Sequence, residues 1–144
     1  MKVVIDTNVM ISGLLNPSGI PAQVLNLLLR GRITILYDNR IMSEYRDVLH
    51  REKFGFASEA IEPLLELVKA GGEFVVPDPH PAAFKDDDDR AFYEVALSGD
   101  ADFLVTGNST HFPGDKRVRS PAEFLRAYLS GPGRGKGRGG RQSR

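Results

Sequence analysis

The sequence contains no cysteine, and this absence excludes several kinds of chemistry at once. Without cysteine the chain cannot form a disulfide, a zinc site with thiolate ligands or a cysteine nucleophile. Histidine is also scarce, with three residues in a chain of 144. We therefore expect His111 to be a surface or structural residue, and any metal site to depend on oxygen ligands.

Long apolar segments are absent as well. No apolar run approaches the roughly 20 residues that a membrane helix requires, and the residues before Asp6 are too few for the apolar part of a signal peptide. The hydrophobic fraction of 41% is ordinary for a globular protein. A chain of this length forms one domain that buries roughly two-thirds of its unfolded surface. We expect a soluble, cytoplasmic protein with no membrane association.

The net charge of zero conceals an uneven distribution of charge. Residues 131–144 contain five basic residues and no acidic one, whereas the rest of the chain has 14 basic and 19 acidic residues and a net charge of −5. This Gly- and Arg-rich segment has no apolar group to bury, so we predict a disordered tail after a folded domain at residues 1–130. The tail could bind nucleic-acid phosphates, or it could be a solubilising terminus or contact the acidic domain. Its candidate nucleic-acid-binding residues are Arg134, Lys136, Arg138 and Arg141.

Strand-like and helix-like segments alternate along the chain, which is typical of a parallel sheet with helices on both faces. The expected strands are residues 2–5, 33–37, 73–77 and 102–106, with a short fifth strand near Val118. The expected helices are residues 21–30, 41–52, 58–70, 89–98 and 121–129, and the last begins with a capping box of Ser120 and Glu123. A Gly- and Pro-rich loop is expected at residues 12–19. We therefore predict an α/β fold, with three α/β/α layers and a central, mainly parallel sheet of four to five strands.

Acidic residues lie where several of these elements meet. Asp6 directly follows the first strand, Glu44 lies in the first turns of the helix after the second strand, and Asp86–Asp89 precede the helix that leads to the fourth. Because the loops after parallel strands gather at one edge of a sheet, we expect these carboxylates to converge. A divalent cation would offset their mutual repulsion, and Mg²⁺ and Mn²⁺ prefer oxygen ligands. Such an ion activates water and holds a phosphodiester for in-line attack.

Each acid also has a purely structural interpretation. Asp6 could be a turn or cap residue at the end of a strand, and Glu44 could be a solvated residue near a helix N-terminus. One or two of the residues Asp86–Asp89 could cap the following helix. Only the joint placement of the acids favours a metal site.

Four short motifs resemble those of PIN-domain proteins when they are taken in order and spacing. They are residues 3–8, 43–45, 88–92 with Ala96, and 104–108. The resemblance covers nearly all of residues 1–130, and the chain looks most like the VapC-like toxins of toxin–antitoxin systems. The resemblance implies an α/β/α sandwich and a Mg²⁺- or Mn²⁺-dependent ribonuclease, usually a homodimer, that is inhibited by a cognate antitoxin.

The resemblance also implies roles for individual residues. Asp6, Glu44 and Asp89 match the three principal acids that bind the metal and carry catalysis in the family. Asn108 stands where many members have a fourth acid, so the resemblance leaves one or two metal ions open. The matching supporting residues are Thr7, Asn8, Asp88, Thr106 and Asn108.

Two alternatives use the same sequence features. A phosphatase of the haloacid-dehalogenase kind also begins with a strand that ends in Asp, but its chemistry needs a second Asp two residues later, and position 8 is Asn. The other alternative is a catalytically weak or inactive PIN-like fold that binds RNA or a protein through the basic tail. We expect the enzyme: a metal-dependent endoribonuclease of the toxin kind.

Overall fold

The computed structural model describes residues 1–131, and its centre is a five-stranded sheet in which each described neighbouring pair of strands is parallel. The strands are β1 (Lys2–Ile5), β2 (Thr34–Tyr37), β3 (Glu73–Phe74), β4 (Phe103–Val105) and β5 (Val118–Arg119), in the spatial order β3-β2-β1-β4-β5. In the middle of the sheet, Val3 lies opposite Ile35 on one side and Phe103 on the other. The predicted α/β fold with a parallel central sheet is confirmed.

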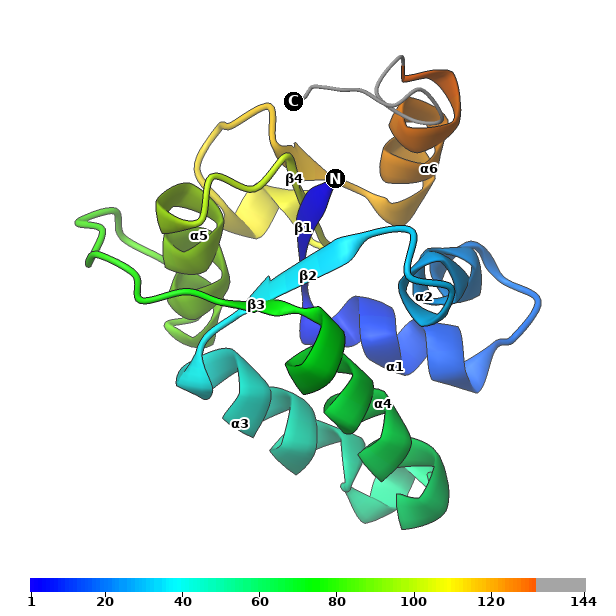
Figure 1. Cartoon of the computed structure of the whole chain (residues 1–144). Coiled ribbons are helices and arrows are strands. Elements are labelled where there is room, and N and C mark those ends of the chain that lie inside the picture. Colours follow the sequence, from blue (N-terminus) through cyan, green and yellow to red (C-terminus); the bar gives the residue numbers. More distant parts are fainter. Residues whose placement is uncertain (132–144) are drawn as a thin grey trace.

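Helices cover both faces of this sheet. They are α1 (Thr7–Leu15), α2 (Ile20–Leu29), α3 (Asn39–Leu49), α4 (Ser58–Gly71), α5 (Asp88–Ser98) and α6 (Pro121–Ser130), with short 3₁₀ helices at Glu52–Phe54 and Ser109–His111. Helix α5 packs on β1, β2 and β4 from one side, and α2, α4 and α6 lie on the other (Figure 1). No helix within residues 1–131 is both long and apolar enough to cross a membrane.

Strand β1 lies at the centre of the sheet and is buried on both faces. Its residues Val3, Val4 and Ile5 are fully inaccessible to solvent. A parallel strand covered on both sides is expected to be a continuous apolar run without alternation, as this one is. The burial of β1 carries the next residue, Asp6, to an inaccessible position at the carboxyl end of the sheet.

The predicted loop after β1 is wrong in part, because residues 7–15 form helix α1. Gly13 suggested a turn, but it lies inside the helix, where it allows α1 to approach α2 closely. A Cβ atom at Gly13 would lie 2.6 Å from Leu25 Cδ1 and 3.1 Å from the Pro21 carbonyl oxygen. The glycine therefore serves helix packing rather than chain reversal.

The remaining elements follow the prediction with shifted boundaries. Strand β3 ends at Phe74 rather than at residue 77, although the Val75 N–H still donates to the Tyr37 carbonyl at 2.8 Å. Pro77, which has no N–H, cannot continue the ladder. The predicted capping box opens α6, with Ser120 Oγ accepting from the Glu123 N–H at 3.1 Å. The predicted tail, apart from its first residue, lies outside the described residues.

Candidate active site

Asp6 lies where β1 ends and α1 begins, and its side chain faces another strand end. Its Oδ2 accepts a hydrogen bond of 2.7 Å from the hydroxyl of Thr106, which follows β4 and is itself fully buried. The Asn108 N–H in turn donates to Thr106 Oγ1 at 3.0 Å, which orients that hydroxyl toward the carboxylate. Asp6 occupies the N-cap position of α1 but makes no capping hydrogen bond. The side chain is therefore held mainly by Thr106, although the Asn8 and Thr7 N–H groups at the start of α1 also act on its charge.

The environment of Asp6 is unfavourable for a negative charge. Burial raises the pKa of Asp6 above its usual value. The Thr106 hydroxyl, the nearby backbone N–H groups of Asn8 and Thr7, and the charge of His111 oppose this rise without cancelling it. The carboxylate is thus held in place without a full counter-charge.

Glu44 is presented by α3, which begins directly after β2. Asp38 caps this helix by accepting from the Ile41 N–H at 2.9 Å. The side chains of Ile41 and Tyr45, four positions apart, anchor one stripe of α3 in the core. Glu44 lies beside this stripe and accepts a short hydrogen bond of 2.5 Å from the Thr7 hydroxyl.

The pKa of Glu44 is also raised above its usual value. Burial is the main cause, the Thr7 hydrogen bond opposes it, and the negative charges of Asp88, Asp6 and Asp89 add to it. The acid that follows β1 and the acids of α3 and α5 therefore act on one another electrostatically. The predicted convergence of these elements at one edge of the sheet agrees with this observation.

Tyr45 fixes the relative placement of the first two acids. Its ring is fully buried, and its hydroxyl donates to the Ile5 carbonyl at 2.5 Å. Ile5 directly precedes Asp6, and Tyr45 directly follows Glu44. One buried hydrogen bond thus ties the backbone that carries one acid to the backbone that carries the other.

We expect Tyr45→Phe to lower the free energy of unfolding by about 1–2 kcal/mol, because the variant leaves a buried carbonyl without its donor. Urea denaturation monitored by circular dichroism measures the change. Tyr128→Phe, at a half-buried tyrosine of α6, is the matched control and should change stability by less than about 0.5 kcal/mol. Equal stability of the two variants would contradict a role for the Tyr45 hydroxyl.

The four consecutive aspartates at the start of α5 have different roles. Asp86 Oδ1 accepts from the Asp88 N–H at 3.0 Å and so satisfies a free N–H of the first turn. Asp87 pairs with Arg90 at 3.1 Å. Asp88 is exposed, whereas Asp89 is buried. The expectation that one or two of the four serve the helix terminus agrees with Asp86, and Asp89 has no such role.

Among the acids of the site, Asp89 has the negative charge that its surroundings compensate least. Its Oδ2 is buried and makes no hydrogen bond, and His111 Nδ1 lies 3.5 Å away from it. Burial, followed by the negative charges of Asp6 and Asp86, raises the pKa of Asp89 to about 6, with His111 acting in the opposite direction. A buried carboxylate oxygen without a partner is the kind of atom that a bound cation would satisfy.

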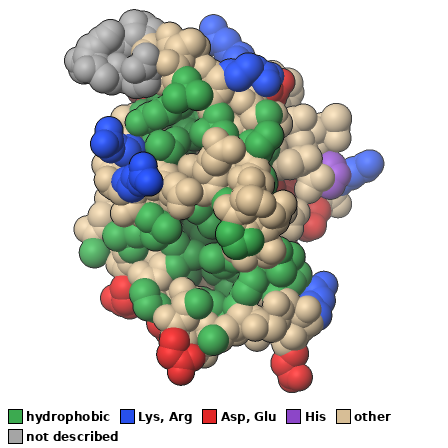
Figure 2. Space-filling model, turned by 90° about the vertical axis from the view of Figure 1, so that its right-hand side faces the viewer, with side chains coloured by type: hydrophobic (Ala, Val, Ile, Leu, Met, Phe, Trp, Pro, Cys, Tyr) green, Lys and Arg blue, Asp and Glu red, His purple; other side chains and the backbone are tan. Residues whose placement is uncertain are grey.

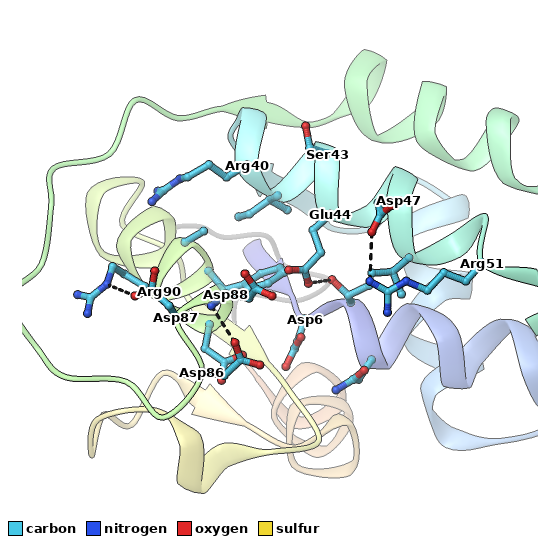
Figure 3. Close-up of a pocket in the computed structure, with 17 residues that line it drawn as sticks. Asp6, Arg40, Ser43, Glu44, Asp47, Arg51, Asp86, Asp87, Asp88 and Arg90 are labelled. Carbon is cyan, nitrogen blue, oxygen red and sulfur yellow. Dashed lines mark hydrogen bonds and ion pairs between the residues drawn. The ribbon is translucent and has the colours of Figure 1, made fainter. Parts of the chain in front are cut away.

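These acids surround an open cavity of about 580 Å³ (Figure 3). The acids that line it are Asp6, Glu44, Asp47, Asp86, Asp87, Asp88 and Asp89, and the basic residues are Arg40, Arg51 and Arg90. Among the predicted supporting residues, Thr7 and Asn8 also line the cavity. Thr106 and Asn108 do not line the cavity: Thr106 contacts Asp6, and the Asn108 N–H contacts Thr106. The predicted nucleic-acid-binding residues of the tail lie outside the described residues.

The cavity suits a divalent cation in its donor chemistry. It offers carboxylate oxygens, the pKa values of Asp6, Glu44 and Asp89 are all raised, and Asp89 Oδ2 lacks a partner. Within residues 1–131, however, no three acidic or histidine side chains are arranged to hold a metal ion as they stand. Threonine hydroxyls hold Asp6 and Glu44 instead. Coordination would therefore require the side chains to move closer together.

Sequence reasoning missed two parts of this region. One is the contact of His111 with Asp89: the sequence predicted a surface or structural histidine, and His111 is partly exposed, but its Nδ1 also lies 3.5 Å from Asp89 Oδ2. The other is the pairing of Arg40 with Asp38 and Glu94, each at 2.8 Å, where both carboxylates are only 4% exposed. Hydrogen bonds from Arg40 and from the His80 N–H lower the pKa of Glu94 although burial alone would raise it. No spacing in the sequence signals a pair of residues 54 positions apart.

Comparison with known proteins agrees with the fold. A family model described as a PIN domain matches residues 2–110. The chain is also 31% identical over 146 residues to "Uncharacterized protein MJ1680" of Methanocaldococcus jannaschii, with 89% of this chain and 92% of that protein covered. No solved structure matches the chain significantly. A match over this much of the sequence establishes that the chain belongs to the PIN-domain family.

Proposed function

We propose that the protein is an endoribonuclease that depends on Mg²⁺ or Mn²⁺ and hydrolyses RNA phosphodiester bonds. Membership of the PIN-domain family indicates a nuclease, and the finer activity is inferred from the cavity. The observation that carries the proposal is the convergence on one cavity of three acids, Asp6, Glu44 and Asp89, whose pKa values are all raised. Perturbed acids that share a cleft are typical of functional sites.

In this proposal Asp6, Glu44 and Asp89 hold the ion. The chemistry supplied by a bound Mg²⁺ or Mn²⁺ is activation of a water molecule and neutralisation of charge on the phosphate. Thr106 orients Asp6, and Thr7 orients Glu44, through the hydrogen bonds described above. Such orienting partners commonly tune the affinity of a metal site.

The exposed residues at the cavity mouth have a different proposed role. Asn8 and Asp88 line the cavity and are accessible to solvent, so they can contact the substrate or the attacking water. Asn108 contributes its backbone N–H to Thr106 and brings no negative charge. Because a neutral residue at this position adds no negative charge to the site, we propose that the site binds one metal ion rather than two.

The resemblance to VapC-like toxins further supports a role as the toxin of a cytoplasmic toxin–antitoxin pair, acting as a homodimer and inhibited by a cognate antitoxin. A surface for a protein partner is available, because hydrophobic side chains gather on the face that carries α1, α2 and α6 (Figure 2). The exposed leucines of these three helices are Leu15 of α1, Leu29 of α2 and Leu129 of α6, each 55–65% exposed. Contiguous exposed apolar surface often marks a protein contact.

The direct test is incubation of the protein with labelled single-stranded and structured RNAs in the presence of Mg²⁺, Mn²⁺ or EDTA. We expect cleavage with either metal and none with EDTA. The neutral Asn108 and the incompletely assembled acid cluster favour one alternative, a PIN fold that binds RNA or a protein without cleaving RNA. Folded protein that cleaves none of the RNAs with any metal would support that alternative.

We further propose that the basic tail, residues 131–144, tethers RNA through phosphate contacts. Deleting it should weaken RNA binding by about tenfold at 0.1 M salt and lower the slope of log affinity against log salt by about 2–3, since each neutralised phosphate of a single strand contributes about 0.7. Fluorescence anisotropy between 50 and 200 mM salt (roughly the range over which such effects are large) measures both. A tail of equal length in which Gly and Ser replace the basic residues is the control for chain length and should match the deletion. An unchanged slope would exclude the tether.

A further inference from the structure

The cavity presents an electrostatic problem for a nuclease. RNA is a polyanion, yet seven acidic side chains line the cavity against three arginines, Arg40, Arg51 and Arg90. Even after a divalent ion has bound, the phosphates that flank the cleaved bond must pass close to uncompensated carboxylates. Basic side chains at the rim are therefore needed to hold the strand.

Two of the three arginines are poorly suited to hold the RNA. Arg90 is occupied by contacts with other parts of the protein, and Arg51 is only weakly held in position. Arg90 pairs with Asp87, donates to the His80 carbonyl at 2.6 Å and lies over the Phe84 ring, so it holds the segment before α5. Arg51 pairs with Asp47, whose side chain is 73% exposed. An exposed pair of this kind fixes a side chain only weakly.

Arg40 differs from both because buried partners hold it. Its Nε and Nη2 contact Asp38 Oδ2, and its Nη1 contacts Glu94 Oε1, all at 2.8 Å. The two carboxylates are 4% exposed and cannot turn away into solvent, whereas the Arg40 side chain is 48% exposed. The guanidinium is therefore fixed in orientation before any ligand arrives.

Arg40 retains donors for such a ligand. A guanidinium carries five N–H groups, and the contacts with Asp38 and Glu94 use three of them. The half-exposed group lines the cavity, where the remaining N–H donors suit a phosphate oxygen. Figure 3 shows Arg40 and Arg90 on one side of Glu44 and Asp6, and Arg51 on the other.

From this geometry we infer that Arg40 binds a phosphate of the RNA strand beside the one that is cleaved, with Asp38 and Glu94 holding its guanidinium in place. This inference rests on the proposed RNA-cleaving function and adds a substrate contact to it. The strand then crosses the acidic cavity with one flanking phosphate fixed on the Arg40 side. In this role Arg40 contributes to RNA binding and does not hold the metal ion.

The test is RNA binding in EDTA, which separates binding from cleavage. Because Arg40→Gln alone leaves two buried carboxylates without their cation and could unfold the protein, the main variant is Arg40→Gln with Glu94→Gln, which leaves only Asp38 in that state and keeps the net charge unchanged. We expect it to bind a labelled single-stranded RNA about five- to tenfold more weakly and to lower the salt slope by about 1. In the cleavage assay its KM should rise with little change in kcat.

Arg46→Gln is the matched control, because Arg46 lies on the same helix, pairs with Glu62 at 2.8 Å and does not line this cavity. It should bind RNA within about twofold of wild type. A double variant that binds RNA as wild type does, or a control that loses as much affinity as the double variant, would overturn the inference and leave Arg40 as a brace between α3 and α5. Wild-type protein that neither binds nor cleaves RNA would overturn the proposed function as well, so the two failures are distinguishable.

Discussion

Replacing Asp6 by Asn should lower the rate of metal-dependent RNA cleavage by about a thousandfold, because one carboxylate of the proposed metal site loses its charge. The fold should remain intact. The Thr106 hydroxyl can still donate to the amide oxygen of the new side chain, and burial, which raises the pKa of Asp6, favours a neutral group at this position. Cleavage of labelled RNA in Mg²⁺ and in Mn²⁺ measures the rate, and thermal unfolding in EDTA verifies the fold.

Asp47→Asn is the matched control for this variant. Asp47 lines the same cavity and its removal subtracts the same charge, but its carboxylate is 73% exposed and pairs with Arg51. We expect this control to keep its activity within about threefold of wild type. If both variants lost activity equally, the general charge of the cavity would explain the effect. If Asp6→Asn cleaved RNA at the wild-type rate, Asp6 would have no part in catalysis.

The placement of Asp6 could be predicted from the sequence because two simple rules agree on it. A continuous apolar run predicts a strand buried on both faces, and the first polar residue after such a strand lies at the carboxyl edge of a parallel sheet. The same reasoning brought Glu44 and the aspartates at the start of α5 to that edge. These placements depend on topology, which alternating strands and helices reveal.

Helix α1 could not be predicted in this way. Gly13 is a poor helix former, and with the Gly- and Pro-rich residues that follow it the segment resembled a loop. The helix forms because packing against α2 outweighs local propensity, and Gly13 is what permits the close approach to Leu25. Such a contact depends on the tertiary structure and leaves no local pattern.

The pairing of Arg40 with Glu94 is a second feature beyond the reach of sequence reasoning. Glu94 lies between Tyr93 and Val95 in a helix, and nothing in the sequence indicates that its carboxylate is buried and paired across the fold. The same holds for His111, whose contact with Asp89 depends on the path of the chain after β4. Long-range ion pairs of this kind can be identified only from the three-dimensional structure.

Replacing Asp89 by Asn should stabilise the metal-free protein at pH 8 and remove its stabilisation by metal. The pKa of Asp89 in the folded protein is raised to about 6, against 3.8 for a free side chain. An acid whose pKa is raised by folding is harder to ionise in the folded state, so its ionisation destabilises the fold. The destabilisation develops between about pH 4 and pH 6 as the pH rises, and it persists above that range.

At pH 8 the variant should therefore unfold about 5 °C above wild type in EDTA, which corresponds to a gain on the order of 2 kcal/mol for a domain of this size. The two proteins should converge as the pH falls below about 4 (roughly the unfolded-state pKa), because wild-type Asp89 then becomes protonated in both states. Added Mn²⁺ should raise the melting temperature of wild type and not that of the variant, since only a protein that binds the ion is stabilised by it. Differential scanning fluorimetry across this pH range, with and without Mn²⁺, measures both effects.

Asp87→Asn is the control from the same aspartate run, because its side chain is 89% exposed and should change the melting temperature by no more than about 1 °C. A melting temperature of Asp89→Asn below that of wild type in EDTA would mean that the ionised carboxylate stabilises the fold, through the helix terminus or through His111. Stabilisation of the variant by Mn²⁺ to the same extent as wild type would mean that Asp89 is not a ligand. A higher melting temperature of the variant in EDTA, together with loss of the Mn²⁺ effect, is expected only if Asp89 is held as an unsatisfied charge that a cation neutralises.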